Sequence, residues 1–184
     1  VRGVSASCFT PCSLSRPAVA KPRAMTQPVA GLQPESGRLG GEAAGLGMLD
    51  ERVVYYYDQV ETDHDVQVRD WSGETIDFHV VPSGLVLAAH AEPDVQVELL
   101  DGPLEAWTGN SVTDRAQVER RLADIRQVGF AWVYEEMSEG INSVAAPIVN
   151  PSGTVIAARV VATARQISDR HAGRMPDEHA ALAG

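Results

Sequence analysis

The 184 residues of this chain are enough for one well-packed domain and leave little room for a second. Hydrophobic residues make up 44% of the chain and charged residues 22%, which excludes the disordered and fibrous classes. Residues 1–40 carry five basic side chains against one acidic side chain, a balance of +4, so the remainder carries −14 of the total −10. Because an acidic surface repels the phosphate backbone, we do not expect the folded part to bind nucleic acid itself.

Residues 1–42 are rich in Pro, Ser, Gly and Ala and show no sustained apolar period, which predicts a flexible segment. This composition is also that of a transit peptide. The two cysteines, Cys8 and Cys12, fall in this segment, and we interpret them as incidental rather than as a disulfide or half of a zinc site. This cysteine usage fits a cytoplasmic, reduced compartment. No apolar run is long enough to cross a bilayer, so we expect no membrane partner.

The predicted domain begins with a β-hairpin. Residues 45–49 and 53–60 are apolar, β-branched or aromatic, and the polar residues 50–52 lie between them. Val66 and Val68 continue the alternation and predict a third strand.

Three helices are predicted next. The apolar run 81–89 predicts a buried helix with Pro82 in its first turn, and residues 93–100 predict a second, shorter helix. The clearest helix spans 114–128, with Thr113 as its N-cap and Gly129 after its last turn. Its apolar side chains recur at helical spacing on one face: Val118, Leu122 and Ile125.

Residues 130–134, 141–149 and 154–162 predict strands, the last two joined by a turn at 150–153. Their near-continuous apolar content predicts a sheet with helices on both faces, and hence a mixed α+β fold. After Ala164 we expect a last helix. The predicted domain is 43–175, followed by a frayed tail at 176–184.

Several stretches resemble the C-terminal domain of IclR transcriptional regulators, namely 113–131, 135–148 and 150–153. The positions that match the family's pattern within this part are Gly129, Glu136, Gly140, Ser143, Ala145 and Asn150. Upstream, residues 46–60 resemble the family's first hairpin and 79–89 its pocket-lining helix, so the resemblance covers Gly45 to Ile167. It implies a GAF-like fold, in which a curved antiparallel sheet with flanking helices has a ligand cavity on one side. It also implies a homodimer or homotetramer.

The family's pocket positions map onto six residues of this chain: Pro82, Ser83, Val133, Ser143, Val160 and Ala162. Relatives that bind small carboxylates offer an acid, hydroxyls and a helix Lys where this chain has Val133, Val160, Ala162 and Leu85. Val149 also departs from the family, which usually has an aromatic residue there. Because burying unpaired carboxylate oxygens is costly, such a lining favours a small apolar or aromatic effector. No cofactor is expected.

Other interpretations apply to individual residues. Ser143 also reads as a small residue that the sheet tolerates, and Glu136 and Gly140 as structural residues. His79 is interpreted as a packed or capping histidine rather than a catalytic base, and Ser83 lacks the Gly-x-Ser-x-Gly setting of a nucleophile. The acidic cluster Asp58, Glu61, Asp63, His64 and Asp65 is the best metal candidate, although such turn residues usually face solvent, so we expect no metal.

The leading hypothesis is therefore the effector-sensing domain of an IclR-type regulator. The family's winged helix-turn-helix, through which such a regulator binds DNA, is not recognisable in residues 1–44. The chain is accordingly interpreted as a fragment, a protein with a misassigned start, or a free-standing sensor. The alternative is a small-molecule enzyme or a free-standing binding protein that uses the same cavity.

Overall fold

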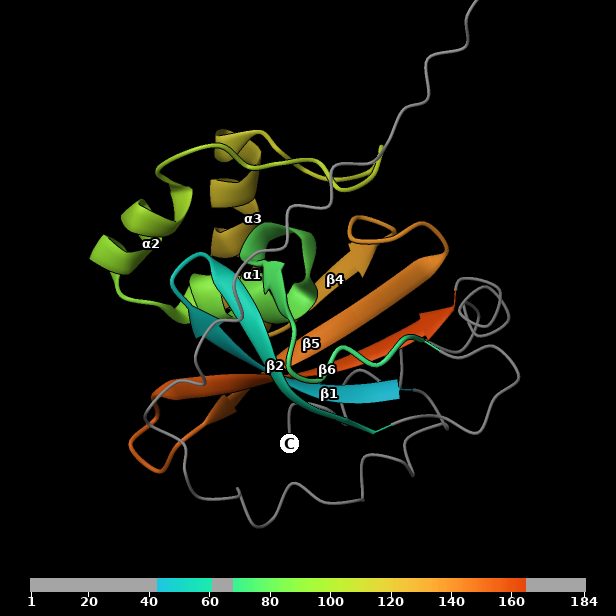
Figure 1. Ribbon diagram of the computed structural model, residues 1–184. Helices are drawn as coiled ribbons and strands as arrows, with labels where there is room; N and C mark the ends of the chain where they lie inside the picture. The colour runs from blue at the N-terminus through green and yellow to red at the C-terminus, as the bar shows by residue number, and fades with distance from the viewer. Residues whose placement is uncertain (1–42, 61–67, 165–184) are drawn as a thin grey trace, which may run out of the picture.

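The computed structural model describes residues 43–60 and 68–164. It has an α+β fold, in which a curved six-stranded sheet carries the helices on one side (Figure 1). The strands are β1 Ala43–Asp50, β2 Val53–Val60, β3 Thr75–Asp77, β4 Ala131–Tyr134, β5 Ile141–Val149 and β6 Val155–Ala164. The helices are the 3₁₀-helix η2 Phe78–Val80 and the α-helices α1 Pro82–His90, α2 Pro93–Leu100 and α3 Arg115–Val128. None of these helices is long and apolar enough to cross a membrane.

The strands follow one another across the sheet in the order β3-β2-β1-β6-β5-β4, and every neighbouring pair is antiparallel. The first and last strands of the described chain, β1 and β6, are therefore paired at the centre. The β1–β2 pair contains an irregularity between Leu46 and Gly47, which shifts the register by one residue. The predicted hairpins β1–β2 and β5–β6 are both confirmed.

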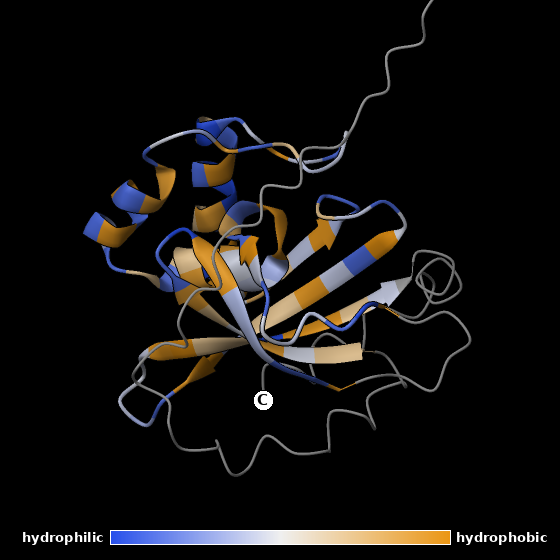
Figure 2. Ribbon diagram, viewed as in Figure 1, coloured by the Kyte–Doolittle hydropathy of each residue, from blue (hydrophilic) through white to orange (hydrophobic). Residues whose placement is uncertain are grey.

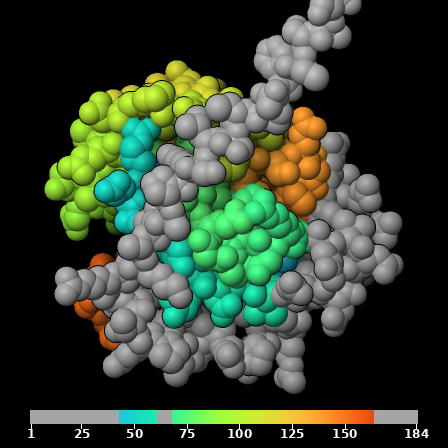
Figure 3. Space-filling model, in the orientation of Figure 1, coloured from blue at the N-terminus to red at the C-terminus, as the bar shows by residue number. Residues whose placement is uncertain are grey.

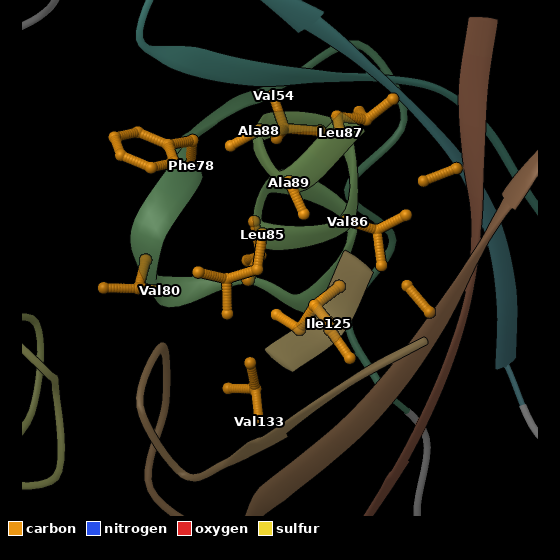
Figure 4. Close-up of a cluster of buried hydrophobic side chains, with 14 of the residues drawn as sticks. Val54, Phe78, Val80, Leu85, Val86, Leu87, Ala88, Ala89, Ile125 and Val133 are labelled. Atoms are coloured by element: carbon orange, nitrogen blue, oxygen red, sulfur yellow. The ribbon is translucent and has the colours of Figure 1, made fainter. Parts of the chain in front are cut away.

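Helix α1 lies against the sheet and is buried from Pro82 to Ala89, which confirms the predicted buried helix. A helix without an exposed face needs cover on both sides, and here the sheet covers one side and α3 another. Figure 4 shows Leu85 of α1, Ile125 of α3 and Val133 of β4 in the same apolar cluster. The start of α1 also packs tightly on η2, because a Cβ added at Gly84 would lie 2.2 Å from the carbonyl oxygen of Phe78. Only glycine fits at this position.

Helix α3 has the predicted apolar face, with Val118, Leu122 and Ile125 buried. Its remaining residues are mainly polar, and Figure 2 shows polar residues concentrated on the outer helices and loops. The predicted end at Gly129 is confirmed, since Gly129 adopts the left-handed conformation at φ 85°. The predicted N-cap is wrong: Asp114, not Thr113, is the capping residue, and its carboxylate accepts a hydrogen bond from the backbone N–H of Gln117 at 2.8 Å.

Two expectations about the sheet are corrected. The third strand is β3, which pairs with β2, whereas Val68 lies outside any strand and Val66 lies outside the described residues. Figure 3 shows the segment after residue 67 lying beside β2. The described helices cover one face of the sheet rather than both (Figure 1). The other face alternates polar residues such as Asp58 and Arg159 with apolar ones, which is not the pattern of a face buried under a helix.

The remaining expectations on segment boundaries concern the flexible segment 1–42, the last helix after Ala164, the domain limit at 175 and the tail 176–184. All of these lie outside the described residues, and they stay predictions.

Candidate functional site

The inner face of the sheet, meaning the face that α1 covers, holds four of the six predicted site residues. Val133 lies opposite Ser143 in the β4–β5 pair, and Ser143 lies opposite Ala162 in the β5–β6 pair, so these three form one row across the sheet. Val160 lies two residues before Ala162, opposite Ala145, and therefore shares the same face one row further along. The register thus brings together residues from three consecutive strands, β4, β5 and β6.

Burial differs along this face. Val133 and Val160 are buried, 1% and 6% exposed, whereas Ser143 and Ala162 are only partly buried. The inner face is therefore closed near its middle and partly accessible at the row that contains the Ser143 hydroxyl.

The other two predicted residues, Pro82 and Ser83, begin α1 and are fully buried. Ser83 lies over β1 and β2: a Cβ added at Gly47 would lie 3.1 Å from the Ser83 Cβ and 2.8 Å from Val54 Cγ1. Gly47 lies opposite Tyr56 of β2 and opposite Ala158 of β6. This row of residues is the next one along the inner face from the row that contains Val160. Ser83 is therefore placed on the β1–β2 side of the inner face, while Val133 and Ser143 are on the β4–β5 side.

The hydroxyl of Ser83 has a partner that the sequence analysis does not identify. The phenol oxygen of Tyr56 lies 2.9 Å from Ser83 Oγ in a buried hydrogen bond. Burial raises the pKa of Tyr56 to about 12, although the bond to Ser83 opposes the shift. The phenol consequently stays neutral and able to donate a hydrogen bond at physiological pH.

The ring of Tyr56 lies beside the glycines of β1. A Cβ added at Gly45 would lie 3.7 Å from Tyr56 Cδ1 and 3.3 Å from Val160 Cγ1, and larger side chains on β1 would compete with both groups for this space. The Tyr56 ring therefore lies close to Val160, one of the predicted site residues.

The loop between α2 and α3 is fastened to the elements beside α1. The Arg52 guanidinium donates to the carbonyl oxygens of Asp101 and Pro103. His79 Nε2 donates to the carbonyl oxygen of Glu105 at 3.0 Å, and Trp107 Nε1 donates to a carboxylate oxygen of Asp77 at 2.9 Å. The interpretation of His79 as a packed histidine is thus the one that its contacts support.

The segment between β4 and β5 is anchored by Glu136, as one interpretation of the sequence proposes. Its carboxylate forms an ion pair with Arg121 of α3 at 2.8 Å. The hydroxyls of Thr108 and Ser111 donate to the backbone carbonyls of Glu135 and Glu136, each with a bond of 2.6 Å. Burial raises the pKa of the Glu136 carboxyl, and the Arg121 charge opposes this shift. These contacts fix the backbone that leads into β5 and Ser143.

The residues considered for enzymatic or metal chemistry have other partners or positions. Ser83 bonds to Tyr56 and His79 to the Glu105 carbonyl, and burial lowers the pKa of His79. Within residues 43–60 and 68–164 no group of three His, Cys, Asp or Glu side chains could hold a metal ion. In the acidic cluster Asp58 is exposed on β2, while Glu61, Asp63, His64 and Asp65, like Cys8 and Cys12, lie outside the described residues.

Comparison with known proteins assigns a family to this fold. Residues 32–179 match the family described as bacterial transcriptional regulator IclR C-terminal. The HTH-type transcriptional regulator BhcR of Paracoccus denitrificans is 32% identical over 139 residues, which cover 74% of this chain and 50% of that protein. The chain thus spans about half the length of the curated relatives it matches.

Two solved structures of similar fold contain small aromatic acids. An IclR homolog from Microbacterium hydrocarbonoxydans complexed with 4-hydroxybenzoate is 27% identical, with a TM-score of 0.66, over 72% of this chain and 55% of that chain. The inducer-binding domain of PobR from Acinetobacter, as a double mutant in complex with 3-hydroxybenzoic acid, is 21% identical, with a TM-score of 0.68, over 76% of this chain and 83% of that chain. The family match, the similarity to BhcR and the fold all agree. This chain belongs to the IclR family of bacterial transcriptional regulators, whose C-terminal domain it contains.

Proposed function

We propose that this domain binds a small aromatic or apolar effector between α1 and the inner face of the sheet. The observation that carries the proposal is the row formed by Val133, Ser143 and Ala162, which is largely apolar, carries one hydroxyl and is partly accessible at Ser143 and Ala162. An apolar surface with a few placed polar groups is typical of a small-molecule site.

The chemistry of the inner face favours an aromatic ligand over a short hydrophilic acid. The side chains that the register places on this face from β1, β4, β5 and β6 are all uncharged: Ala43, Ala131, Val133, Ser143, Ala145, Pro147, Ala158, Val160 and Ala162. A carboxylate buried against these four strands has no cationic partner there, which is costly for any acid, and a short acid has little apolar area to offset that cost. An aromatic ring instead gains from the burial of its apolar area. The two hydroxybenzoate complexes of similar fold support the same class of ligand.

In an intact regulator, occupancy of this site would shift the arrangement of subunits and hence the affinity for DNA. The chain covers about half of its curated relatives, so we assign DNA binding to a winged helix-turn-helix domain separate from the domain described here. We propose a homodimer or homotetramer as the unit in which the effector acts.

A thermal-shift screen tests the proposal. A ligand that binds only the folded state, at about 100 times its dissociation constant, stabilises that state by about 2.7 kcal/mol. We expect 4-hydroxybenzoate and benzoate to raise the melting temperature and lactate and pyruvate to leave it unchanged. If the short acids stabilise the chain and the aromatic acids do not, the proposed ligand class is wrong.

A substitution locates the site. Ser143→Leu places a bulky side chain in the partly accessible row and should abolish the shift, whereas Ser72→Leu, in the exposed turn before β3, should preserve it. An unchanged shift in Ser143→Leu would place the ligand elsewhere.

A further inference from the structure

The Tyr56–Ser83 pair has one more hydroxyl hydrogen than the hydrogen bond between the two side chains uses. Each side chain carries one O–H group, and the single bond of 2.9 Å between the two oxygens takes one of the two hydrogens. Neither side chain makes another hydrogen bond to any of the described residues. Among the residues that the structure describes, one O–H donor of the pair therefore has no acceptor.

This donor is buried in an apolar setting. Tyr56 is 5% exposed and Ser83 is fully buried, and the side chains of Val54 and Val160 lie against the neighbouring glycines of β1, Gly47 and Gly45. A buried donor without an acceptor costs free energy, so a ligand oxygen that accepts this hydrogen would be bound favourably. Val160, which also belongs to the proposed effector site, lies close to the Tyr56 ring, since one Cβ position at Gly45 would contact both Val160 Cγ1 and Tyr56 Cδ1.

The phenol is suited to donating rather than to carrying charge. Its raised pKa keeps it neutral at all physiological pH values, so it does not repel an oxygen that bears partial or full negative charge.

We propose that the Tyr56–Ser83 pair determines the specificity of the effector site by donating its unused hydroxyl hydrogen to an acceptor oxygen on an aromatic effector. The selected class is an aromatic ring that bears a carboxylate, carbonyl or phenolic oxygen at the end buried toward β1 and β2. This inference rests on the proposed function and adds Tyr56 to the residues that act there.

The decisive variant is Tyr56→Phe/Ser83→Ala, measured by isothermal titration calorimetry with benzoate and with phenol as probes. Replacing both partners of a buried hydrogen bond by apolar groups of similar shape is nearly neutral for folding, so we expect the double variant to keep its stability. Its affinity for the probe whose oxygen meets the pair should fall about tenfold to hundredfold, because hydrogen bonds to charged or strongly polar groups contribute in this range. If the pair had only a structural role, the double variant would not lose affinity for the probe while it kept its stability.

The two probes distinguish the source of the oxygen. A loss for benzoate alone places the carboxylate at the pair, and a loss for phenol alone places the phenolic oxygen there. The matched control is Tyr55→Phe, which removes a hydroxyl from an equally buried tyrosine of the same strand and should leave both affinities unchanged.

Unchanged affinities in the double variant would overturn this inference and leave the proposed function standing. If the wild-type chain binds neither probe nor 4-hydroxybenzoate, the proposed function falls, and this inference falls with it.

Discussion

The ion pair between Arg121 and Glu136 lies at the edge of the site, and we expect its contribution to the free energy of unfolding to depend on pH. The Glu136 side chain is 7% exposed and that of Arg121 23%, so the carboxylate is the more buried partner. Removing one partner of such a pair leaves an uncompensated buried charge, and the cost exceeds the net value of the intact pair.

We predict that Arg121→Met lowers the free energy of unfolding by about 2–4 kcal/mol at pH 7.5. Burial holds the pKa of folded Glu136 above its unfolded value, and loss of Arg121 raises it further. A carboxyl whose pKa is raised by folding favours the folded state most when it is protonated, so the deficit of the variant should shrink as pH falls through that raised pKa toward 4.5. Urea denaturation of wild type and variant at both pH values measures the change.

The control for this prediction is Arg121→Met/Glu136→Gln, in which no carboxylate remains to titrate and the pH dependence of the deficit should disappear. A deficit that is constant between pH 4.5 and 7.5 would contradict the assignment to Glu136.

Residue by residue, the sequence identifies the inner-face residues that match the family, and it misses Tyr56. The strand holds Tyr55, Tyr56 and Tyr57 in succession, and the first two are both buried. Alternation alone therefore does not say which tyrosine faces α1. The irregularity between Leu46 and Gly47, which sets the register of Tyr56 against β1, has no signal in the sequence.

At the scale of elements, the capping of α3 gives a prediction that separates two adjacent residues. Asp114 accepts a hydrogen bond from an N–H of the first turn, and its negative charge interacts favourably with the helix dipole. Asp114→Ala should therefore lower the free energy of unfolding by about 1 kcal/mol, while Thr113→Ala should change it by less than about 0.5 kcal/mol. Chemical denaturation of both variants tests this, and a larger effect at Thr113 would restore it as the cap.

Elements with strong periodicity or clear turns are predicted well, as the two hairpins, α1 and α3 show. The strand β3 is missed because it has only three residues, of which Ile76 alone is buried, and is too short to establish an alternation. Two capping residue types in succession, Thr113 and Asp114, likewise leave the start of α3 undecided, since only the backbone conformation fixes where the helix begins.

For the whole molecule, we predict self-association at micromolar concentration. Strand β4 is an edge of the sheet, and its Trp132 and Tyr134 rings stack at 5.9 Å with Tyr134 59% exposed. An exposed edge with an aromatic pair is a surface suited to a second copy. Sedimentation velocity should show a species larger than a monomer.

Salt provides the check on the cause of this association. The net charge of −10 makes copies repel one another, and added salt screens that repulsion. Association through apolar contacts should therefore strengthen from about 0.1 M to 1 M NaCl. A monomer under both conditions would contradict the prediction, and dissociation in high salt would point to ion pairs instead.

The pairing of β1 with β6 at the centre of the sheet forms a seam, meaning the line along which the two halves of the sheet would separate under tension. Ala43, where β1 begins, lies opposite Ala162 near the end of β6, so the described chain enters and leaves the sheet at neighbouring points. Tension between segments attached at these two points would peel the strands apart one hydrogen bond after another, instead of loading all the bonds together as in shear. The seam also joins β3-β2-β1 to β6-β5-β4, the two halves of the platform beneath α1. A pull on the flanking segments would thus act first at the Ala43–Ala162 end of the seam and would reach Gly47, over which Ser83 lies, last.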